Sequence, residues 1–364
     1  RASYGQTGKV NFPPYVARTT YKMFTDGWYK TGFGGTLYAL GNTNLTWETT
    51  NTWDAGVELS LWKRLLYIKA SYYQKKTVDL VNSVTIPSST GFTTYMDNIG
   101  EVENKGYELG FRSEVVRRKD LFVAVFANLA HNENRILKIS ESLKAYNDRV
   151  KDHFANSNRF DGSNTQPFTQ YVEGGSQTSI WGVPSLGIDP ATGEEIFIRP
   201  DGSITNTWNT NDQVVLGDME PKIQGTFGLN ATYKNLSLYM TFMYEAGGQI
   251  YNSTLRDKVE DVNVYTSNVD KRVFSERWQE PGDKARYRKL TSGVGGSIMR
   301  TRPTSRFVED NNVLTLNSIS LGYDFDAGQK WMKTIGLSML RFEIGANDVC
   351  RWSSVKVERG LNYP

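Results

Sequence analysis

The most constraining feature of this sequence is a pair of alternating segments between Thr50 and Tyr73 that meet at a tight basic turn, Lys63-Arg64. In the first segment every second side chain is apolar, at Trp53, Ala55, Val57, Leu59 and Leu61. In the second segment the apolar positions are Leu66, Ile68, Ala70 and Tyr72. Successive side chains of a strand point to opposite sides, so the pattern predicts a hairpin with one apolar and one polar face. A soluble sheet can have this pattern, whereas a transmembrane barrel requires it.

The same two-faced hairpin recurs three times further along the chain, over residues 107–130, 226–244 and 313–347. A shorter strand is expected near Arg1–Gly5. Each of these strands would be about ten residues long, which is enough to cross the apolar part of a bilayer when the strand is tilted. These strands alone would leave open edges in lipid, where unpaired backbone groups are not tolerated.

The connections between the hairpins are long and rich in Gly, Asn, Ser, Thr and Asp, and we expect loops near residues 82–105, 131–223 and 246–312. Structureless loops of this size would be unusual inside a compact soluble domain. Short turns that alternate with long loops are typical of outer-membrane barrels, with the turns on the periplasmic side. The sequence therefore predicts an all-β fold, an antiparallel transmembrane β-barrel with short periplasmic turns and long extracellular loops.

Composition excludes several other classes of protein. No run of eighteen apolar residues exists, so helical membrane spans are not expected. The net charge is +3, with 42 basic and 39 acidic residues, and this balance gives no field that would attract nucleic acid. Cys350 is the only cysteine, which excludes an intrachain disulfide framework and every multi-cysteine metal site.

No arrangement of residues predicts catalysis, a cofactor or a metal site. His131 and His153 are the only histidines, and neither has the spacing of a metal-binding motif. The acidic pairs Glu101 with Glu103 and Glu194 with Glu195 could suggest glycoside hydrolysis, but spacing in sequence does not give the separation of two carboxylates in space. A calcium site is conceivable but less expected than ordinary turns at Asp201, Asn209, Asn211 and Asp212.

Two groups of residues are candidates for contact with a ligand or with the lumen. Aromatic side chains in the longest loop could stack on sugar or peptide ligands, or could pack the loop's own core, and they are Tyr171, Trp181 and Trp208. Charged side chains on the polar faces of the hairpins are expected to face the lumen, and they are Asp54, Glu58, Glu108, Arg112, Arg341 and Glu343.

Several blocks of this sequence resemble one family, the SusC/RagA-type TonB-dependent transporters of Bacteroidota outer membranes. They include LGNTNLTWETTNTWDAGVEL from Leu40, NIGEVENKGYELGF from Asn98, SLGIDPATGEEIFI from Ser185, VVLGDMEPKIQGTFG from Val214 and TSRFVEDNNVLTLNSISLGYDF from Thr304. The resemblance extends over the whole chain, with the blocks in the expected order and spacing. Each block alone is a weak signal, and their combination is specific.

The resemblance implies that residues 1–364 are a C-terminal part of a wide barrel of about 22 strands. In such proteins a plug domain fills the lumen, a TonB box reaches the periplasm and a SusD-like lipoprotein covers the extracellular side. The plug, the TonB box and the last strand would lie outside this sequence. The resemblance thus implies a location in the outer membrane, in contact with lipid, TonB and a SusD-like partner.

The function implied by the resemblance is TonB-dependent import of a nutrient, without any enzymatic activity. An oligosaccharide is the expected substrate because the loops are aromatic and weakly charged. Import of a peptide by the same mechanism is an alternative. A soluble, secreted all-β carbohydrate-binding protein is the alternative from a different class, since its hairpins could bury their apolar faces against a second sheet.

Overall fold

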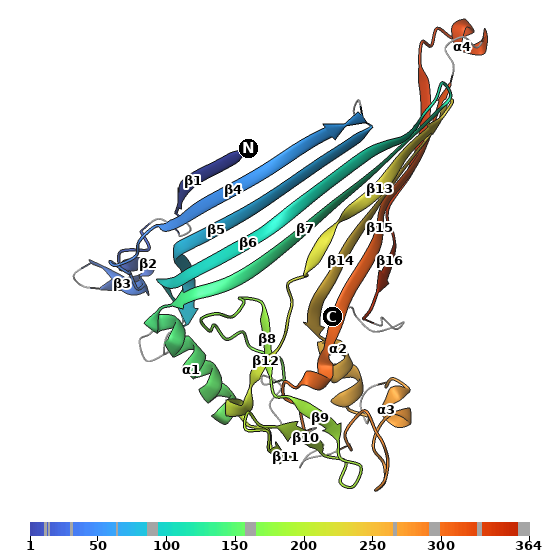
Figure 1. Ribbon diagram of the computed structural model, residues 1–364. Helices are drawn as coiled ribbons and strands as arrows, with labels where there is room; N and C mark the ends of the chain where they lie inside the picture. The colour runs from blue at the N-terminus through green and yellow to red at the C-terminus, as the bar shows by residue number, and fades with distance from the viewer. Residues whose placement is uncertain are drawn as a thin grey trace.

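The computed structural model of the protein describes residues 1–10, 13, 15–29, 32–62, 65–85, 94–156, 165–264, 268–290, 299–325 and 330–355. Its largest element is a sheet of nine antiparallel strands, which forms a curved, open wall (Figure 1). The strands lie in the order β1 (Ala2–Lys9), β4 (Glu48–Leu61), β5 (Leu66–Thr85), β6 (Thr94–Arg117), β7 (Leu121–Ile139), β13 (Ile223–Tyr233), β14 (Leu236–Tyr251), β15 (Val308–Phe325) and β16 (Leu340–Ser353). The hairpins predicted from the alternating pattern are all present, and so is the short strand at the start of the chain.

One face of the wall, which we call the outer face, carries a continuous row of apolar side chains. Across the sheet from β4 to β15, the row consists of Leu59, Ile68, Phe111, Ala127, Phe227, Phe242 and Leu316. Other side chains of this face are largely exposed, including Val57 at 57%, Phe342 at 64% and Ile344 at 63%. An exposed apolar surface of this extent does not suit water, and it is the surface that a barrel presents to lipid.

Aromatic side chains lie at both ends of the apolar outer face. Tyr72 faces Tyr107 near one end, and Tyr233, Leu236 and Tyr323 form a row near the other. On β13, Gly225 lies opposite Tyr244, and Tyr233 belongs to the row at the other end. The eight residue steps between Gly225 and Tyr233 span about 26 Å at 3.3 Å per residue. With the usual tilt of about 40°, this length covers about 20 Å of membrane thickness, close to the apolar band of outer-membrane barrels.

Several strands are longer than the alternating pattern indicates, and this corrects the predicted loop over residues 82–105 and shortens the other two, since β14 continues to Tyr251 and β15 begins at Val308. Strand β5 continues to Thr85 and β6 begins at Thr94, so most of that segment belongs to a hydrogen-bonded ladder. Strand β7 likewise continues to Ile139. These extensions rise beyond the apolar band, where water can reach both faces. The alternation of apolar and polar residues that marks a membrane-crossing strand is therefore lost there.

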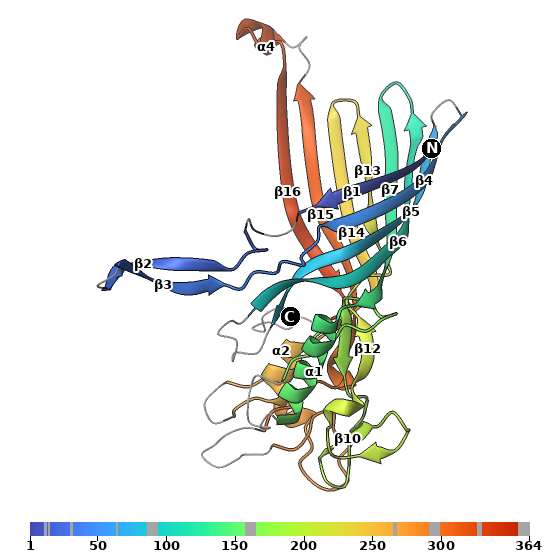
Figure 2. The same cartoon turned by 90° about the vertical axis from the view of Figure 1, so that its left-hand side faces the viewer.

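The two ends of the wall differ as predicted, with short turns at one end and long connections at the other. Short connections join β6 to β7 and β13 to β14 at one end. At the other end, the described residues within 141–222 and 252–307 form a folded unit, which we call the loop domain (Figures 1 and 2). The hairpin β2 (Thr20–Tyr29) and β3 (Gly32–Ala39) projects from the same end, beside β1 and β4. The basic turn Lys63-Arg64 lies outside the described residues.

The loop domain contains helices and small sheets rather than unstructured chain. Its longest helix is α1 (Glu141–Asn156), and the described residues contain no helix that is long and apolar enough to span a membrane. The remaining elements are β8 (Ser179–Gly182), β9 (Ser185–Ile188), β10 (Glu195–Ile198), β11 (Ile204–Thr205), η4 (Thr210–Asp212), β12 (Val214–Asp218), α2 (Ser253–Leu255), η5 (Arg256–Glu260), α3 (Arg272–Ser275) and η7 (Ser305–Phe307). A short helix, α4 (Lys330–Thr334), lies in the β15–β16 connection at the opposite end of the wall.

A buried ionic network holds the loop domain together. Arg306 binds Glu195 through two hydrogen bonds of 2.8 and 2.9 Å and also donates to Glu260 at 2.7 Å. Arg288 donates to Asp261 at 3.0 Å, and Asp261 accepts two further bonds from Thr301. Burial alone would lower the pKa of Arg306, but the carboxylates of Glu260 and Glu195 hold it well above its usual value. Each buried charge thus depends on a partner from a distant part of the sequence.

Replacing Arg306 with Leu should destabilise the loop domain by about 3–5 kcal/mol, because Glu195 would stay buried without its cation and Glu260 would keep only Arg288, at 3.4 Å. Hydrogen exchange of the β10 amides in the intact protein would measure the change. Lys144→Leu is the control, since the Lys144–Glu141 ion pair lies at the surface and contributes little. Equal protection in the two variants would show that the network does not stabilise the domain.

Replacing Phe227 with Arg should destabilise the intact barrel in lipid by about 2–4 kcal/mol, because the charge would enter the apolar band. The neighbouring change Thr226→Arg puts the same side chain on the opposite face of β13 and should have a much smaller effect. Denaturant unfolding in lipid vesicles compares the two variants. A larger loss for Thr226→Arg would reverse the assignment of the two faces.

Candidate substrate-binding surface

The face of the wall opposite the apolar rows, which we call the inner face, holds the charged residues predicted to face the lumen. Near one edge of the sheet, Asp54 accepts a hydrogen bond from the Ser3 hydroxyl at 2.8 Å, and Glu58 accepts one from the Tyr67 hydroxyl at 3.1 Å. Arg112 lies directly across from Tyr67 in the register of β5 and β6. These side chains therefore form one polar patch across the first strands of the wall.

Arg341 and Glu343 form a second polar patch on the inner face, at the opposite edge of the sheet. Arg341 Nε lies 3.3 Å from a carboxylate oxygen of Glu343, and Nη1 lies 3.6 Å from Asp324. Arg341 also donates to the Ser237 hydroxyl at 3.2 Å. The six predicted residues thus share a face but lie in separate places along it, and their role toward a lumen stays a prediction.

A hollow of about 410 Å³ lies on the inner face between these patches, and we call it the wall hollow. Its polar lining residues come from four neighbouring strands and include Lys69, Ser71, Glu108, Asn128, Gln224 and Thr226. Gly110 leaves part of the floor without a side chain. Among the described residues, neither Lys69 nor Glu108 forms an ion pair, so both charges are available to whatever fills the space beside the wall.

Between the wall hollow and the loop domain, a series of hydrogen-bonded amide side chains joins the wall to the loop domain. The Tyr73 hydroxyl donates to Asn132 at 2.8 Å, and Asn134 donates to Asn104 at 2.9 Å and to Gln177 of the loop domain at 3.2 Å. The Gln177 main-chain amide returns a bond to Asn134 at 3.0 Å. These contacts fix the base of the loop domain on the polar side of β7.

Glycine at position 106 is required for this junction. Tyr73 reaches Asn132 by passing over β6 at Gly106, which lies directly across from Tyr73 in the register. A Cβ atom on Gly106 would lie 2.7 Å from the Tyr73 hydroxyl oxygen and 2.1 Å from the carbonyl oxygen of His131. Any side chain there would displace the tyrosine or the neighbouring strand.

Of the three loop aromatics that were candidates for ligand stacking, Tyr171 and Trp208 have partners within the loop domain. Tyr171 packs against α1, with its ring 5.9 Å from Tyr146, and burial raises its pKa. Trp208 lies between Phe154, at 5.4 Å, and the Arg302 guanidinium, at 4.8 Å, and its indole donates to the Pro303 carbonyl. Trp181 lies half-buried on β8, and its indole N–H makes no hydrogen bond with the described residues. The positions of Tyr171 and Trp208 agree with packing of the domain, and contact with a ligand stays a prediction for all three aromatics.

The residues considered for calcium binding serve as local turn and cap residues. Asp201 accepts two hydrogen bonds from Ser203, whose hydroxyl and amide lower the pKa of the carboxyl group. Asn209 caps η4 by accepting from the Asn211 amide, and Asp212 lies 3.9 Å from Arg199. Within the described ranges no group of three or more His, Cys, Asp or Glu side chains is arranged to hold a metal ion.

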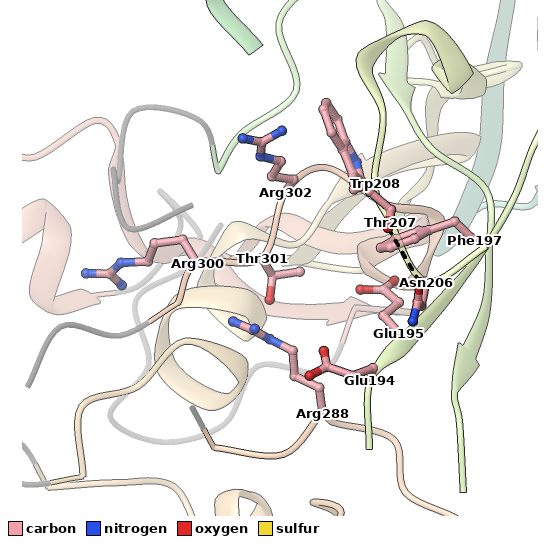
Figure 3. A pocket seen from close by; sticks show the side chains of 10 residues that line it. All are labelled: Glu194, Glu195, Phe197, Asn206, Thr207, Trp208, Arg288, Arg300, Thr301 and Arg302. Atoms are coloured by element: carbon pink, nitrogen blue, oxygen red, sulfur yellow. Dashed lines mark hydrogen bonds between the residues drawn. The ribbon is translucent and has the colours of Figure 1, made fainter. Parts of the chain in front are cut away.

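Sequence reasoning missed a smaller hollow of about 60 Å³ in the loop domain, which we call the arginine hollow (Figure 3). It is lined by Glu194, Glu195, Phe197, Asn206, Thr207, Trp208, Arg288, Arg300, Thr301 and Arg302. The acidic pair singled out in the sequence has cationic partners here, since Glu194 lies 3.1 Å from Lys289 and Glu195 binds Arg306. The residues come from segments about a hundred positions apart, so no local motif could reveal the site.

The fold and sequence both match known proteins. Residues 1–241 match the family model described as TonB dependent receptor-like, beta-barrel. TonB-dependent receptor P26 of Formosa agariphila is 28% identical over all of this chain, and SusC of Bacteroides thetaiotaomicron is 25% identical over 89% of it. This chain covers 36% and 31% of those two relatives, or about a third of their length.

Among solved structures, that of the RagAB peptide transporter superposes with a TM-score of 0.78. The similarity covers 97% of this chain and 37% of that chain, at 21% sequence identity, so it supports the fold alone. The family model spans well over half of the chain. The chain therefore belongs to the TonB-dependent receptor-like β-barrel family of the outer membrane, and SusC is among its sequence relatives.

Proposed function

We propose that the intact protein imports an oligosaccharide across the outer membrane in a TonB-dependent step, with a SusD-like lipoprotein above the loop domain. The observation that carries the proposal is the polar inner face, which continues from the loop domain through the amide chain at Asn132 to the wall hollow. Such a surface gives a hydroxyl-rich solute hydrogen-bonding partners along its path, while the apolar outer face keeps the wall in lipid.

The residues of this chain would bind and guide the solute without breaking any of its bonds. Amide and carboxylate groups such as Asn128, Gln224 and Glu108 can exchange hydrogen bonds with sugar hydroxyls as they exchange them with water. The acidic pair Glu194 and Glu195 is engaged with Lys289 and Arg306, which does not favour the general acid and base roles of a glycosidase.

Import of a peptide by the same route is the second candidate, because the solved neighbour with the same fold is described as a peptide transporter. That property belongs to the neighbour, whose sequence identity with this chain is 21%. The soluble carbohydrate-binding alternative conflicts with the family membership and with the exposed apolar rows of the outer face. Growth of a deletion strain on defined glycans or on peptides as sole carbon source, with and without TonB, tests the two import candidates against each other.

Replacing Glu58 with Leu should slow import several-fold in cells carrying the intact gene, because an apolar side chain would replace a hydrogen-bonding group on the inner face. The amount of folded barrel in the outer membrane should stay the same. Val57→Leu is the matched control on the adjacent outward position, where lipid accepts the larger side chain. If Glu58→Leu instead prevents membrane insertion while uptake per folded barrel is unchanged, the inner face has no part in transport.

A further inference from the structure

The short-turn end of the wall, opposite the loop domain, carries a cluster of exposed cations (Figure 2). The β6–β7 turn holds Arg118 and Lys119, and the β13–β14 turn holds Lys234. The two turns are in direct contact, because the Lys234 main-chain amide donates a hydrogen bond to the Asp120 carbonyl at 2.7 Å. We call Arg118, Lys119 and Lys234 the basic rim.

Lys234 lies on the lipid side of this end. Tyr233 is six residues after Phe227 on a strand whose register is regular, so its ring points to the outer face, and it is 55% exposed. The Lys234 ammonium lies over that ring, 5.5 Å from its centroid. A lysine over an outward tyrosine is the arrangement expected where the apolar band of a membrane meets the polar headgroups.

Aromatic side chains extend the apolar outer face as far as this end. Tyr323 on β15 faces Leu236 across the strands and belongs to the same row as Tyr233. The ring centroids of Tyr323 and Phe325 lie 4.9 Å apart, and that of Phe325 lies 5.8 Å from that of Trp331 on α4. The basic rim therefore adjoins the surface that the wall presents to lipid, at the level of an aromatic belt.

Cations on the inner face at the same end are paired with carboxylates of this chain. Arg117, opposite the inward Phe122, lies 3.0 Å from a carboxylate oxygen of Glu114, and Arg341 lies 3.6 Å from Asp324. By contrast, no cation of the basic rim forms an ion pair with any residue that the structure describes. Pairing thus follows the two faces of the wall, and the unpaired charges are those beside the membrane surface.

The basic rim has an excess of positive charge. Its two turns contain one carboxylate, Asp120, so the three cations exceed the anions by two charges. Guanidinium and ammonium groups form charge-assisted hydrogen bonds with phosphate oxygens. A cation near an anionic membrane surface gains about fivefold in affinity from this attraction. The charge excess and the neighbouring lipid surface therefore indicate the same partner.

We propose that the basic rim binds the phosphate groups of anionic phospholipids in the periplasmic leaflet of the outer membrane. The short turns of outer-membrane barrels lie on the periplasmic side. The rim supplies the donors for the phosphate, while Tyr233 and the row beside it contact the acyl chains. An acidic protein fits less well, because it would have to displace lipid from Tyr233. This surface does not depend on which solute is imported.

The first test is native mass spectrometry of the intact transporter in detergent. The probes are dioleoyl phosphatidylglycerol, which is anionic, and dioleoyl phosphatidylcholine, which is zwitterionic and has the same acyl chains. Phosphatidylglycerol should bind at least about fivefold more tightly, as expected for one or more unpaired cations beside its phosphate. Raising the salt to about 0.5 M should remove most of this preference, because exposed charges are screened.

Two sets of variants locate the binding site. Lys234→Asn should lower the affinity for phosphatidylglycerol about fivefold, whereas Lys234→Arg should retain it. Asn suits this position because the backbone φ of residue 234 is 52°, in the left-handed region. Arg118→Gln combined with Lys119→Gln removes two cations from a separate turn, and it should lower the affinity about tenfold or more even if Lys234→Asn disturbs folding.

Lys75→Gln is the matched control on the inner face. The Lys75 ammonium also lies over a tyrosine ring, 5.1 Å from the centroid of Tyr73, but Tyr73 points toward Asn132 on the polar side of the wall. This variant should leave the affinity for phosphatidylglycerol within about twofold of the parent protein, because no lipid headgroup lies on that side.

A second measurement tests the leaflet. Lys119→Cys, made together with Cys350→Ser, should react with a membrane-impermeant maleimide only after the outer membrane of the cells is permeabilised. The inference fails if phosphatidylcholine binds as tightly as phosphatidylglycerol, or if Lys234→Asn and Lys75→Gln lower the affinity equally. Labelling of residue 119 in intact cells would place the rim in the other leaflet and would also overturn it.

Discussion

The whole structure depends on the pairing of every membrane-crossing strand with its neighbours in one register. In lipid, backbone amide and carbonyl groups have no water to bind, so the ladder between strands must satisfy them. The register that does this also aligns Leu59, Ile68 and Phe111 into one row, and a slip of one residue would turn the whole row toward the polar side. Hydrogen bonding and the separation of the two faces are therefore a single constraint.

The loop domain obeys a different rule, because it lies beyond the apolar band and must stabilise itself in water. It has few long elements, and its core combines apolar packing around Val259 and Phe307 with the buried ion pairs of Arg288 and Arg306. Buried ion pairs add little net stability compared with apolar packing. They strongly disfavour wrong arrangements of the chain, because a buried charge without its partner is costly. The domain therefore gains a defined geometry, and this geometry shapes the arginine hollow.

The sequence was sufficient for the part of the fold that repeats. Alternation at Trp53 to Leu61 and at Phe227 to Tyr233 predicted the hairpins and their two faces, because lipid on one side imposes a period of two. It failed for residues 94–105, where strand β6 continues in water and alternation is no longer required. It also missed the arginine hollow, since Glu195 and Arg306 are 111 positions apart and neither lies in a recognisable motif. The sequence places the three aromatic residues in a loop but does not reveal their packing partners, because side chains within that loop do not alternate with a regular period.

The separation of Glu195 and Arg306 along the chain has a consequence for the order of assembly. The hairpin of β13 and β14 lies between them in sequence and forms part of the wall. In this arrangement the chain leaves the loop domain, passes up and down the wall through β13 and β14, and returns at residue 306. Glu195 therefore gains its cation only when the part of the loop domain that follows β14 has come back beside the part that precedes β13.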